Sequence, residues 1–166
     1  MSENFKERLK KVKAFVFDID GVLTNGVVNI HSDNTTSRTI QTKDYYALEH
    51  AAKNGYTVAI ISASDAESMK AILKRLGVHE IYLGSIDKEE IFKEFITVYS
   101  LEAEETLYMG DDIPDLLAMR RAGVPTCPYD AAREIREISV YISPLKGGEG
   151  CARDVIEQVM RLHGKW

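Results

Sequence analysis

The segment Ala14-Phe15-Val16-Phe17-Asp18-Ile19-Asp20-Gly21-Val22-Leu23-Thr24 decides the fold. Its first four residues are apolar, as is typical of a strand that is buried on both faces of a parallel sheet. Two aspartates follow at once, at the edge of the sheet beyond which ligands bind in folds of this class. A single aspartate at a strand end can simply cap a turn, but Asp18 and Asp20 together, followed by Gly21, indicate a functional site.

Strands and helices are predicted to alternate along the rest of the chain. Further apolar runs predict strands at Thr57 to Ser62, Glu80 to Leu83, Thr106 to Met109 and Val124 to Cys127, with an edge strand at Val140 to Ile142. The stretches between them predict helices at Tyr46 to Asn54, Ala66 to Leu76, Lys88 to Tyr99, Pro114 to Arg121 and Ala152 to His163. This order predicts an α/β fold with a doubly wound, mostly parallel sheet.

Two segments depart from the alternation. Residues 26–42 have β-branched runs on either side of Ser32-Asp33-Asn34, which predicts a projecting β-hairpin. The glycine-rich stretch from Lys146 to Gly150 is expected to be a mobile loop before the last helix. No long linker is visible, and 166 residues suit one domain, so we expect residues 1–166 to form a single unit.

Charge and composition exclude several classes of protein. The 21 basic residues are scattered among 26 acidic ones, and the net charge of -5 argues against nucleic acid as a partner. The N-terminal segment, residues 1–13, is polar and basic, so we expect neither a signal peptide nor a membrane anchor there, and a cytoplasmic protein. Cys127 and Cys151 lack metal-ligand or redox spacing and are expected to be reduced thiols.

Residues able to do chemistry also follow the later strands. Ser62 ends the strand that begins at Thr57, and Gly110-Asp111-Asp112-Ile113-Pro114-Asp115 follows the strand that ends at Met109. A serine alone could cap the next helix, and an acidic first turn is favoured by the helix dipole. Lys88 lies at a helix start, where a cation opposes the dipole, so its position indicates a function.

Taken in order, these segments resemble the four motifs of the haloacid dehalogenase phosphatases, and the resemblance covers nearly the whole chain. It implies that Asp18 is the nucleophile that attacks phosphorus. Asp20 would protonate the leaving oxygen and then activate water. Lys88 would neutralise the nucleophile and the phosphate, while the Ser62 hydroxyl and the next backbone N–H, that of Ala63, would hold a phosphoryl oxygen.

A magnesium ion is expected beside these residues. Phosphate monoester hydrolysis is extremely slow without a catalyst, so the charge of the transferring group must be neutralised as well as attacked. Mg²⁺ uses one or two carboxylates, waters and substrate phosphate as ligands. The expected protein ligands are Asp18, the backbone carbonyl of Asp20, and Asp111, with Asp115 orienting Asp111 or Lys88.

Haloacid dehalogenase enzymes usually carry a cap domain, for which this chain has no room. A capless chain with this hairpin and with Gly147-Gly148-Glu149-Gly150-Cys151-Ala152-Arg153 near its end resembles the 3-deoxy-D-manno-octulosonate 8-phosphate phosphatase family of lipopolysaccharide biosynthesis. The resemblance implies a small phosphorylated sugar acid as substrate. It also implies a homotetramer in which the hairpins form a central barrel and the Gly147 to Gly150 segment reaches a neighbouring site.

The residues that read the substrate differ from that family. The family commonly has Thr-Gly-Arg at the second motif, where this chain has Ser62-Ala63-Ser64, and family arginines are also expected near Glu49 and Ile72. A sugar carboxylate prefers a cationic partner, so the missing charge should come from elsewhere. The candidate substrate contacts are Lys43 and Arg75, Arg153 or Lys146 of a neighbouring chain, and, close to the hairpin, His31, Gln41 and Asp44.

Three other functions stay open from the sequence. A phosphatase for a nine-carbon ulosonate phosphate would keep the same chemistry and change only the residues that read the substrate. A non-catalytic tetramerisation module has the same fold, but Asp18, Asp20, Lys88 and Asp111 are all present. A phospho-acceptor signalling domain also uses a sheet-edge aspartate with magnesium and lysine, but carries its acceptor on a middle strand, apart from the acidic pair.

Overall fold

The computed structural model describes residues 4–166, so the first three residues of the polar N-terminal segment lie outside it. Six parallel strands form one sheet in the order β5-β4-β1-β6-β7-β8. These strands are β1 Ala14–Phe17, β4 Thr57–Ile61, β5 Glu80–Tyr82, β6 Thr106–Met109, β7 Val124–Cys127 and β8 Tyr141–Ile142. From the central β1 the chain winds outward to both edges, which confirms the doubly wound parallel sheet and the edge position of β8.

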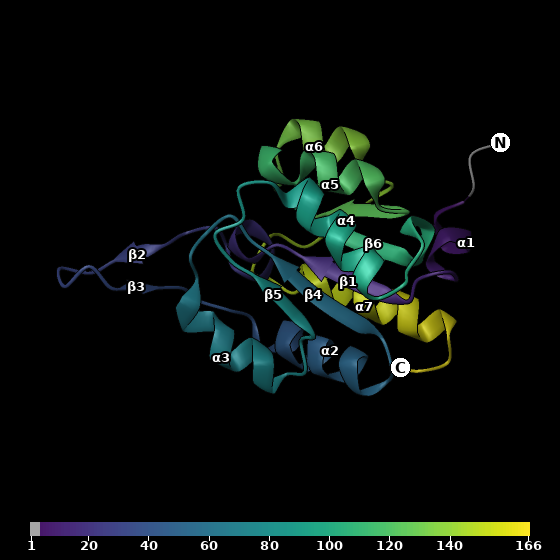
Figure 1. Ribbon diagram of the computed structural model, residues 1–166, viewed down its shortest axis with the longest axis horizontal. Helices are drawn as coiled ribbons and strands as arrows, with labels where there is room; N and C mark the ends of the chain where they lie inside the picture. Colours follow the sequence, from purple (N-terminus) through teal and green to yellow (C-terminus); the bar gives the residue numbers. More distant parts are fainter. Residues whose placement is uncertain (1–3) are drawn as a thin grey trace.

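Helices cover both faces of this sheet (Figure 1). They are α1 Phe5–Leu9, α2 Thr42–Lys53, α3 Glu67–Arg75, α4 Lys88–Val98, α5 Leu116–Arg121, α6 Arg133–Ile138 and α7 Cys151–Leu162, with short helical turns η1 Ile19–Leu23, η2 Ala103–Glu105 and η3 Ile113–Asp115. The five predicted helices are present, although α2 begins at Thr42 rather than Tyr46. The short helices α1 and α6 were not predicted.

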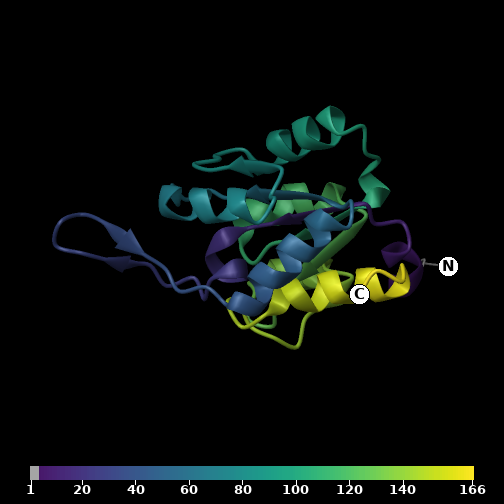
Figure 2. The same cartoon turned by 90° about the horizontal axis from the view of Figure 1, so that it is seen from below.

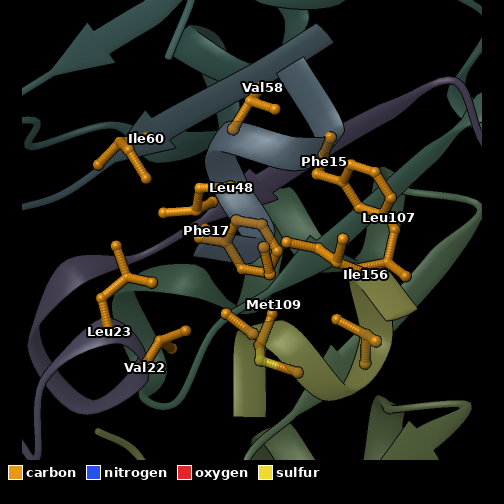
Figure 3. Close-up of a cluster of buried hydrophobic side chains, with 14 of the residues drawn as sticks. Phe15, Phe17, Val22, Leu23, Leu48, Val58, Ile60, Leu107, Met109 and Ile156 are labelled. Carbon is orange, nitrogen blue, oxygen red and sulfur yellow. The ribbon is translucent and has the colours of Figure 1, made fainter. Parts of the chain in front are cut away.

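Alternation along β1 divides the core into two layers. Phe15 and Phe17 point to the layer that contains α1, α2, α3 and α7, whereas Ala14 and Val16 point to the layer under α4, α5 and α6. Figure 3 shows the first layer, with Phe15 and Phe17 among side chains from both flanking strands. Because both phenylalanines are fully buried, truncating either to alanine would cost about 3–5 kcal/mol. The core therefore fixes β1, and with it the position of the residues that follow.

The predicted hairpin projects from the sheet domain (Figures 1 and 2). Its strands, β2 Asn29–Ile30 and β3 Thr36–Ser37, are antiparallel. The predicted turn is confirmed, with Asn34 in a left-handed conformation at φ 64° and the Asp33 side chain accepting from the N–H of Thr35 at 3.0 Å. A bridge between Thr24 and Ile40 closes the base of the hairpin, so the hairpin grows directly out of the segment after Asp20.

The glycine-rich segment 146–150 is not a mobile loop, which corrects the prediction. Its glycines let the backbone pack against the segment from Gly21 to Asn25 of the same chain. The N–H of Gly148 donates to the carbonyl of Val22 at 2.9 Å, and that of Gly147 donates to Asp130 at 3.0 Å. A Cβ on Gly147 would lie 2.1 Å from the carbonyl oxygen of Gly21, so no larger residue fits there.

Replacing Gly147 with alanine tests this packing. The added methyl group would push two backbones apart, so we expect Gly147→Ala to lower the free energy of unfolding by about 1–3 kcal/mol in urea denaturation. The matched control is Lys146→Ala, which truncates an exposed neighbour and should change the stability by less than about 0.5 kcal/mol. Equal stability of the two variants would show that the segment is not packed.

Candidate active site

The candidate site lies at the carboxyl ends of β1, β4 and β6, where the strand order reverses. Asp18 directly follows β1, Ser62 follows β4, and Asp111 comes two residues after β6. Lys88 begins α4 and brings its side chain to the same place. Segments far apart in the sequence are thus joined at the edge where doubly wound sheets bind ligands.

Lys88 is the buried cation of the site. Only 1% of its surface is exposed, and its Nζ lies 2.8 Å from Asp18 Oδ2 and 2.8 Å from Asp115 Oδ1. Burial opposes its charged form, but the two carboxylates outweigh burial and raise the pKa of Lys88. The lysine therefore stays protonated and can neutralise negative charge.

Asp18 is held in one orientation from both sides. Its Oδ1 accepts from the N–H of Ile19 at 2.6 Å while Oδ2 faces Lys88. Burial, followed by the nearby charge of Asp115, raises the pKa of Asp18 to about 7. This carboxylate is the only one of the site that is placed at the end of the central strand.

Three carboxylates of the site lie close to one another, near the ammonium group of Lys88. Oxygen atoms of Asp18, Asp111 and Asp115 lie within 4.8 Å of one another. Burial, and then the charges of Asp18 and Asp115, raise the pKa of Asp111 to about 8, while Lys88 only partly opposes this rise. A hard divalent cation with oxygen ligands fits this excess of carboxylates, so the residues present suit Mg²⁺.

Asp115 differs from the other two because its oxygens are already occupied. Its Oδ1 accepts from Lys88 and, at 3.0 Å, from the hydroxyl of the buried Tyr108, while Oδ2 accepts from the N–H of Asp111 at 3.2 Å. It therefore orients both Lys88 and the segment of Asp111. The role of Tyr108 was not anticipated, because in the sequence it is one residue of an apolar strand.

Two glycines make room for these carboxylates. A Cβ on Gly21, where φ is +89°, would lie 1.9 Å from Asp111 Oδ2, and a Cβ on Gly110 would lie 2.4 Å from Asp115. Both positions therefore require glycine for steric reasons. The glycines that follow Asp20 and precede Asp111 are part of the geometry of the site.

Asp20 is clamped by an arginine that the sequence analysis missed. Arg38 Nε lies 2.7 Å from Asp20 Oδ1 and its Nη2 lies 3.0 Å from Oδ2, and the arginine side chain is only 5% exposed. Thr24 Oγ1 adds a hydrogen bond to Oδ1 at 3.1 Å. Although burial opposes ionisation, the hydrogen bonds of Arg38, Ser64 and Thr24 lower the pKa of Asp20.

The segment after β4 places two hydroxyl groups at the site. Ser62 is buried, and its Oγ lies 3.2 Å from Ser64 Oγ and accepts from the N–H of Ser64 at 3.3 Å. Ala63 between them is exposed. Ser64, which occupies the position of the expected arginine, instead contacts Asp20.

Several predicted substrate contacts lie elsewhere. Asp44 is fully buried, and its Oδ1 accepts from the N–H of Arg153 at 2.8 Å, so it caps the start of α7 and is not available to a substrate. Arg75 ends α3, about 12 Å along the helix from its start beside the sheet edge, and lines a surface depression with Glu49. Gln41 caps α2, and Lys43 lies beside Arg153 at the surface.

Known proteins share this architecture. The family pattern of the haloacid dehalogenase-like hydrolases matches residues 45–123. The 3-deoxy-D-manno-octulosonate 8-phosphate phosphatase of Haemophilus influenzae is 24% identical over 160 residues, which cover 96% of this chain and 89% of the relative.

Solved structures agree with that match. A probable YrbI family phosphatase from Pseudomonas syringae pv. phaseolica superimposes with a TM-score of 0.93 at 33% identity, covering 97% of this chain and 92% of that one. The 3-deoxy-D-manno-octulosonate 8-phosphate phosphatase of Moraxella catarrhalis, solved with magnesium, phosphate and the sugar acid KDO, gives 0.91 at 29% identity, covering 95% and 90%. With its motifs in order at one sheet edge, the chain belongs to the haloacid dehalogenase-like hydrolases, in the family of the 3-deoxy-D-manno-octulosonate 8-phosphate phosphatases.

Proposed function

We propose that this chain is a Mg²⁺-dependent phosphatase that hydrolyses 3-deoxy-D-manno-octulosonate 8-phosphate to the free sugar acid and phosphate, through an aspartyl-phosphate on Asp18. The observation that carries the proposal is the placement of Asp18 beside the buried Lys88 and close to Asp111. Named relatives of the chain act on this substrate, and one of them was solved with magnesium and phosphate. We propose the same cation here, held by Asp18, Asp111 and the backbone carbonyl of Asp20.

In this proposal each residue has a separate task. A carboxylate oxygen of Asp18 forms a bond to phosphorus while the bond from phosphorus to the sugar oxygen breaks, and Asp20 gives that oxygen a proton. Asp20 then takes a proton from water, whose oxygen attacks phosphorus and releases Asp18 and phosphate. Lys88 and the Ser62 hydroxyl stabilise the phosphoryl oxygens. Bound magnesium would supply further positive charge for the transferring group.

The wider setting of the enzyme is also a proposal. Ile30 and Val27 on the hairpin are exposed at 78% and 56% of their surface. They support a homotetramer in which hairpins of several chains pack together, because apolar residues on a projecting hairpin favour burial.

The buried, unpaired thiols of Cys127 and Cys151 support a reducing, cytoplasmic compartment. No helix within residues 4–166 is long and apolar enough to cross a bilayer. The proposed substrate places the reaction in lipopolysaccharide biosynthesis.

Removing the nucleophile tests the covalent mechanism. Asp18→Asn keeps the shape of the side chain but cannot form the aspartyl-phosphate, so kcat should fall by about 10⁴-fold or more. Circular dichroism should show an intact fold. Asp112→Asn is the matched control, since Asp112 is exposed in the same acidic segment and its replacement should leave phosphate release nearly unchanged.

Binding of Mg²⁺ should change the thermal stability of the protein, which can be measured without a substrate. Without Mg²⁺, the raised pKa values of Asp18 and Asp111 mean that the folded protein holds protons which the unfolded chain releases at lower pH. The melting temperature should therefore fall as the pH rises from the unfolded pKa of 3.8 toward the folded values of about 7 and about 8, and level off above them. Mg²⁺ at 100 times its Kd should add about 2.7 kcal/mol and reduce this dependence.

The variants Asp111→Asn and Asp112→Asn separate this effect from nonspecific ion binding. Asp111→Asn should lose most of the stabilisation by Mg²⁺ in differential scanning fluorimetry, whereas Asp112→Asn should keep it. A response that is equal in both variants would argue against a metal site at Asp111.

Substrate preference tests the assignment of the sugar acid. Phosphate release should be measured with Mg²⁺ from 3-deoxy-D-manno-octulosonate 8-phosphate, from a nine-carbon ulosonate 9-phosphate and from D-arabinose 5-phosphate, which has no carboxylate. We expect kcat/KM to be highest for the octulosonate. A preference for the nine-carbon substrate would keep the phosphatase chemistry and move the chain to the alternative reaction, which the sequence Ser62-Ala63-Ser64 left open.

A further inference from the structure

The contact between Arg38 and Asp20 joins the hairpin to the catalytic loop. Arg38 follows β3 on the returning arm of the hairpin, and its guanidinium meets both oxygens of Asp20, at 2.7 and 3.0 Å. This is the parallel, bidentate arrangement in which arginine recognises carboxylates. Thr36 Oγ1 lies 3.4 Å from Nη1 and adds only a weak contact from the hairpin.

This arrangement opposes acid catalysis by Asp20. A general acid needs one carboxyl oxygen that carries a proton and points at the leaving oxygen. In this structure Arg38 occupies one position on each oxygen, and Thr24 occupies a second position on Oδ1. The guanidinium beside Asp20 also favours the ionised carboxylate, so Asp20 holds a proton for the leaving oxygen more readily once Arg38 moves away.

The position of Arg38 suggests what replaces Asp20 as its partner. Asp20 acts on the bond between phosphorus and the sugar, so Arg38, in contact with Asp20, lies on the sugar side of the phosphate. The second-motif arginine expected from the family is replaced by Ser64, so the nearest guanidinium comes from the hairpin. A carboxylate on the substrate offers the same two oxygens as Asp20.

We propose that Arg38 is a specificity residue of this enzyme, which exchanges the Asp20 carboxylate for the carboxylate of the sugar acid and thereby frees Asp20 when the correct substrate binds. This inference rests on the proposed function. A phosphate ester without a carboxylate cannot make the exchange, so it must break the ion pair between Arg38 and Asp20 without compensation. The preference for the sugar acid then arises both from its binding to Arg38 and from the release of Asp20 by Arg38.

Arg38→Met tests the proposal with two substrates, 3-deoxy-D-manno-octulosonate 8-phosphate and D-arabinose 5-phosphate, which has no carboxylate. For the octulosonate we expect kcat/KM to fall by about 10-fold to 100-fold, because a charge-assisted contact is lost. For D-arabinose 5-phosphate, whose alkoxide leaving group needs a proton, we expect it to rise by about threefold to tenfold, because the clamp on Asp20 is gone. The ratio of the two values is the decisive measurement: a fall supports the proposal, while an unchanged or higher ratio overturns it.

Two further measurements exclude simpler explanations. The free sugar acid, without phosphate, should inhibit D-arabinose 5-phosphate hydrolysis by the wild-type enzyme and should inhibit Arg38→Met at least tenfold more weakly; equal inhibition would overturn the proposal. If Arg38→Met does not fold, Arg38→Lys keeps the charge without the fork, and the same fall in the ratio is expected. Arg133→Met is the matched control, since Arg133 is exposed in an ion pair with Glu137, and it should leave the ratio unchanged.

Failure of the proposed function has a different signature. A wild-type enzyme that does not prefer the octulosonate over D-arabinose 5-phosphate would contradict the substrate assignment before any variant is made. A wild-type preference that persists in Arg38→Met would contradict the role of Arg38 alone.

Discussion

The site depends on one buried ammonium group that is shared by carboxylates. Lys88 has almost no exposed surface and lies between Asp18 and Asp115 at equal distances of 2.8 Å. Removing one partner of a buried ion pair leaves an uncompensated charge and typically costs about 3–5 kcal/mol, so each of these residues constrains the other two. Because Asp18 follows β1, Asp115 follows β6 and Lys88 begins α4, this cluster fastens three elements together at the edge of the sheet.

The same cluster holds more carboxylates than the one ammonium group of Lys88 can neutralise. Asp111 adds a further carboxylate within 4.8 Å, and its pKa is raised first by burial and then by the charges of Asp18 and Asp115. Glycine at positions 21 and 110 leaves room for these carboxylates, because any side chain there would collide with Asp111 or Asp115. The cation site therefore depends on these two glycines as well as on the acidic side chains.

The sequence predicted the parts of this molecule whose signals are local. Apolar runs located β1 and β6 to the residue, and the aspartates after them fell at the predicted edge, because the strand end determines where the next side chain lies. The prediction that Asp44 contacts the substrate was wrong, although its spacing in the helix indicates a buried position. It shares the buried stripe of α2 with Ala47, Leu48 and Ala51, so the helical period turns its carboxylate into the protein, where it caps α7.

Contacts made through tertiary structure had no comparable signal. Arg38 is a single arginine in a polar hairpin, and nothing in the neighbouring residues shows that it reaches Asp20, 18 residues earlier. Its position depends on the bridge between Thr24 and Ile40, which joins the two ends of the hairpin. The packing of Gly147 against Gly21 was missed for the same reason, since a glycine-rich segment is compatible both with mobility and with close backbone contact.

These contacts connect the hairpin with the loop of Asp20 in a chain that has no cap domain. The segment from Gly21 to Asn25 leads from the catalytic Asp20 into the hairpin, and on its other side it is braced by Gly147 and Gly148. Those glycines precede α7, whose start is fixed by the buried Asp44. A shift of the hairpin therefore acts directly on the backbone beside Asp20, and the brace limits that shift. In such a fold the geometry of Asp20 and the position of the hairpin are coupled, because one short segment joins them and Arg38 contacts Asp20.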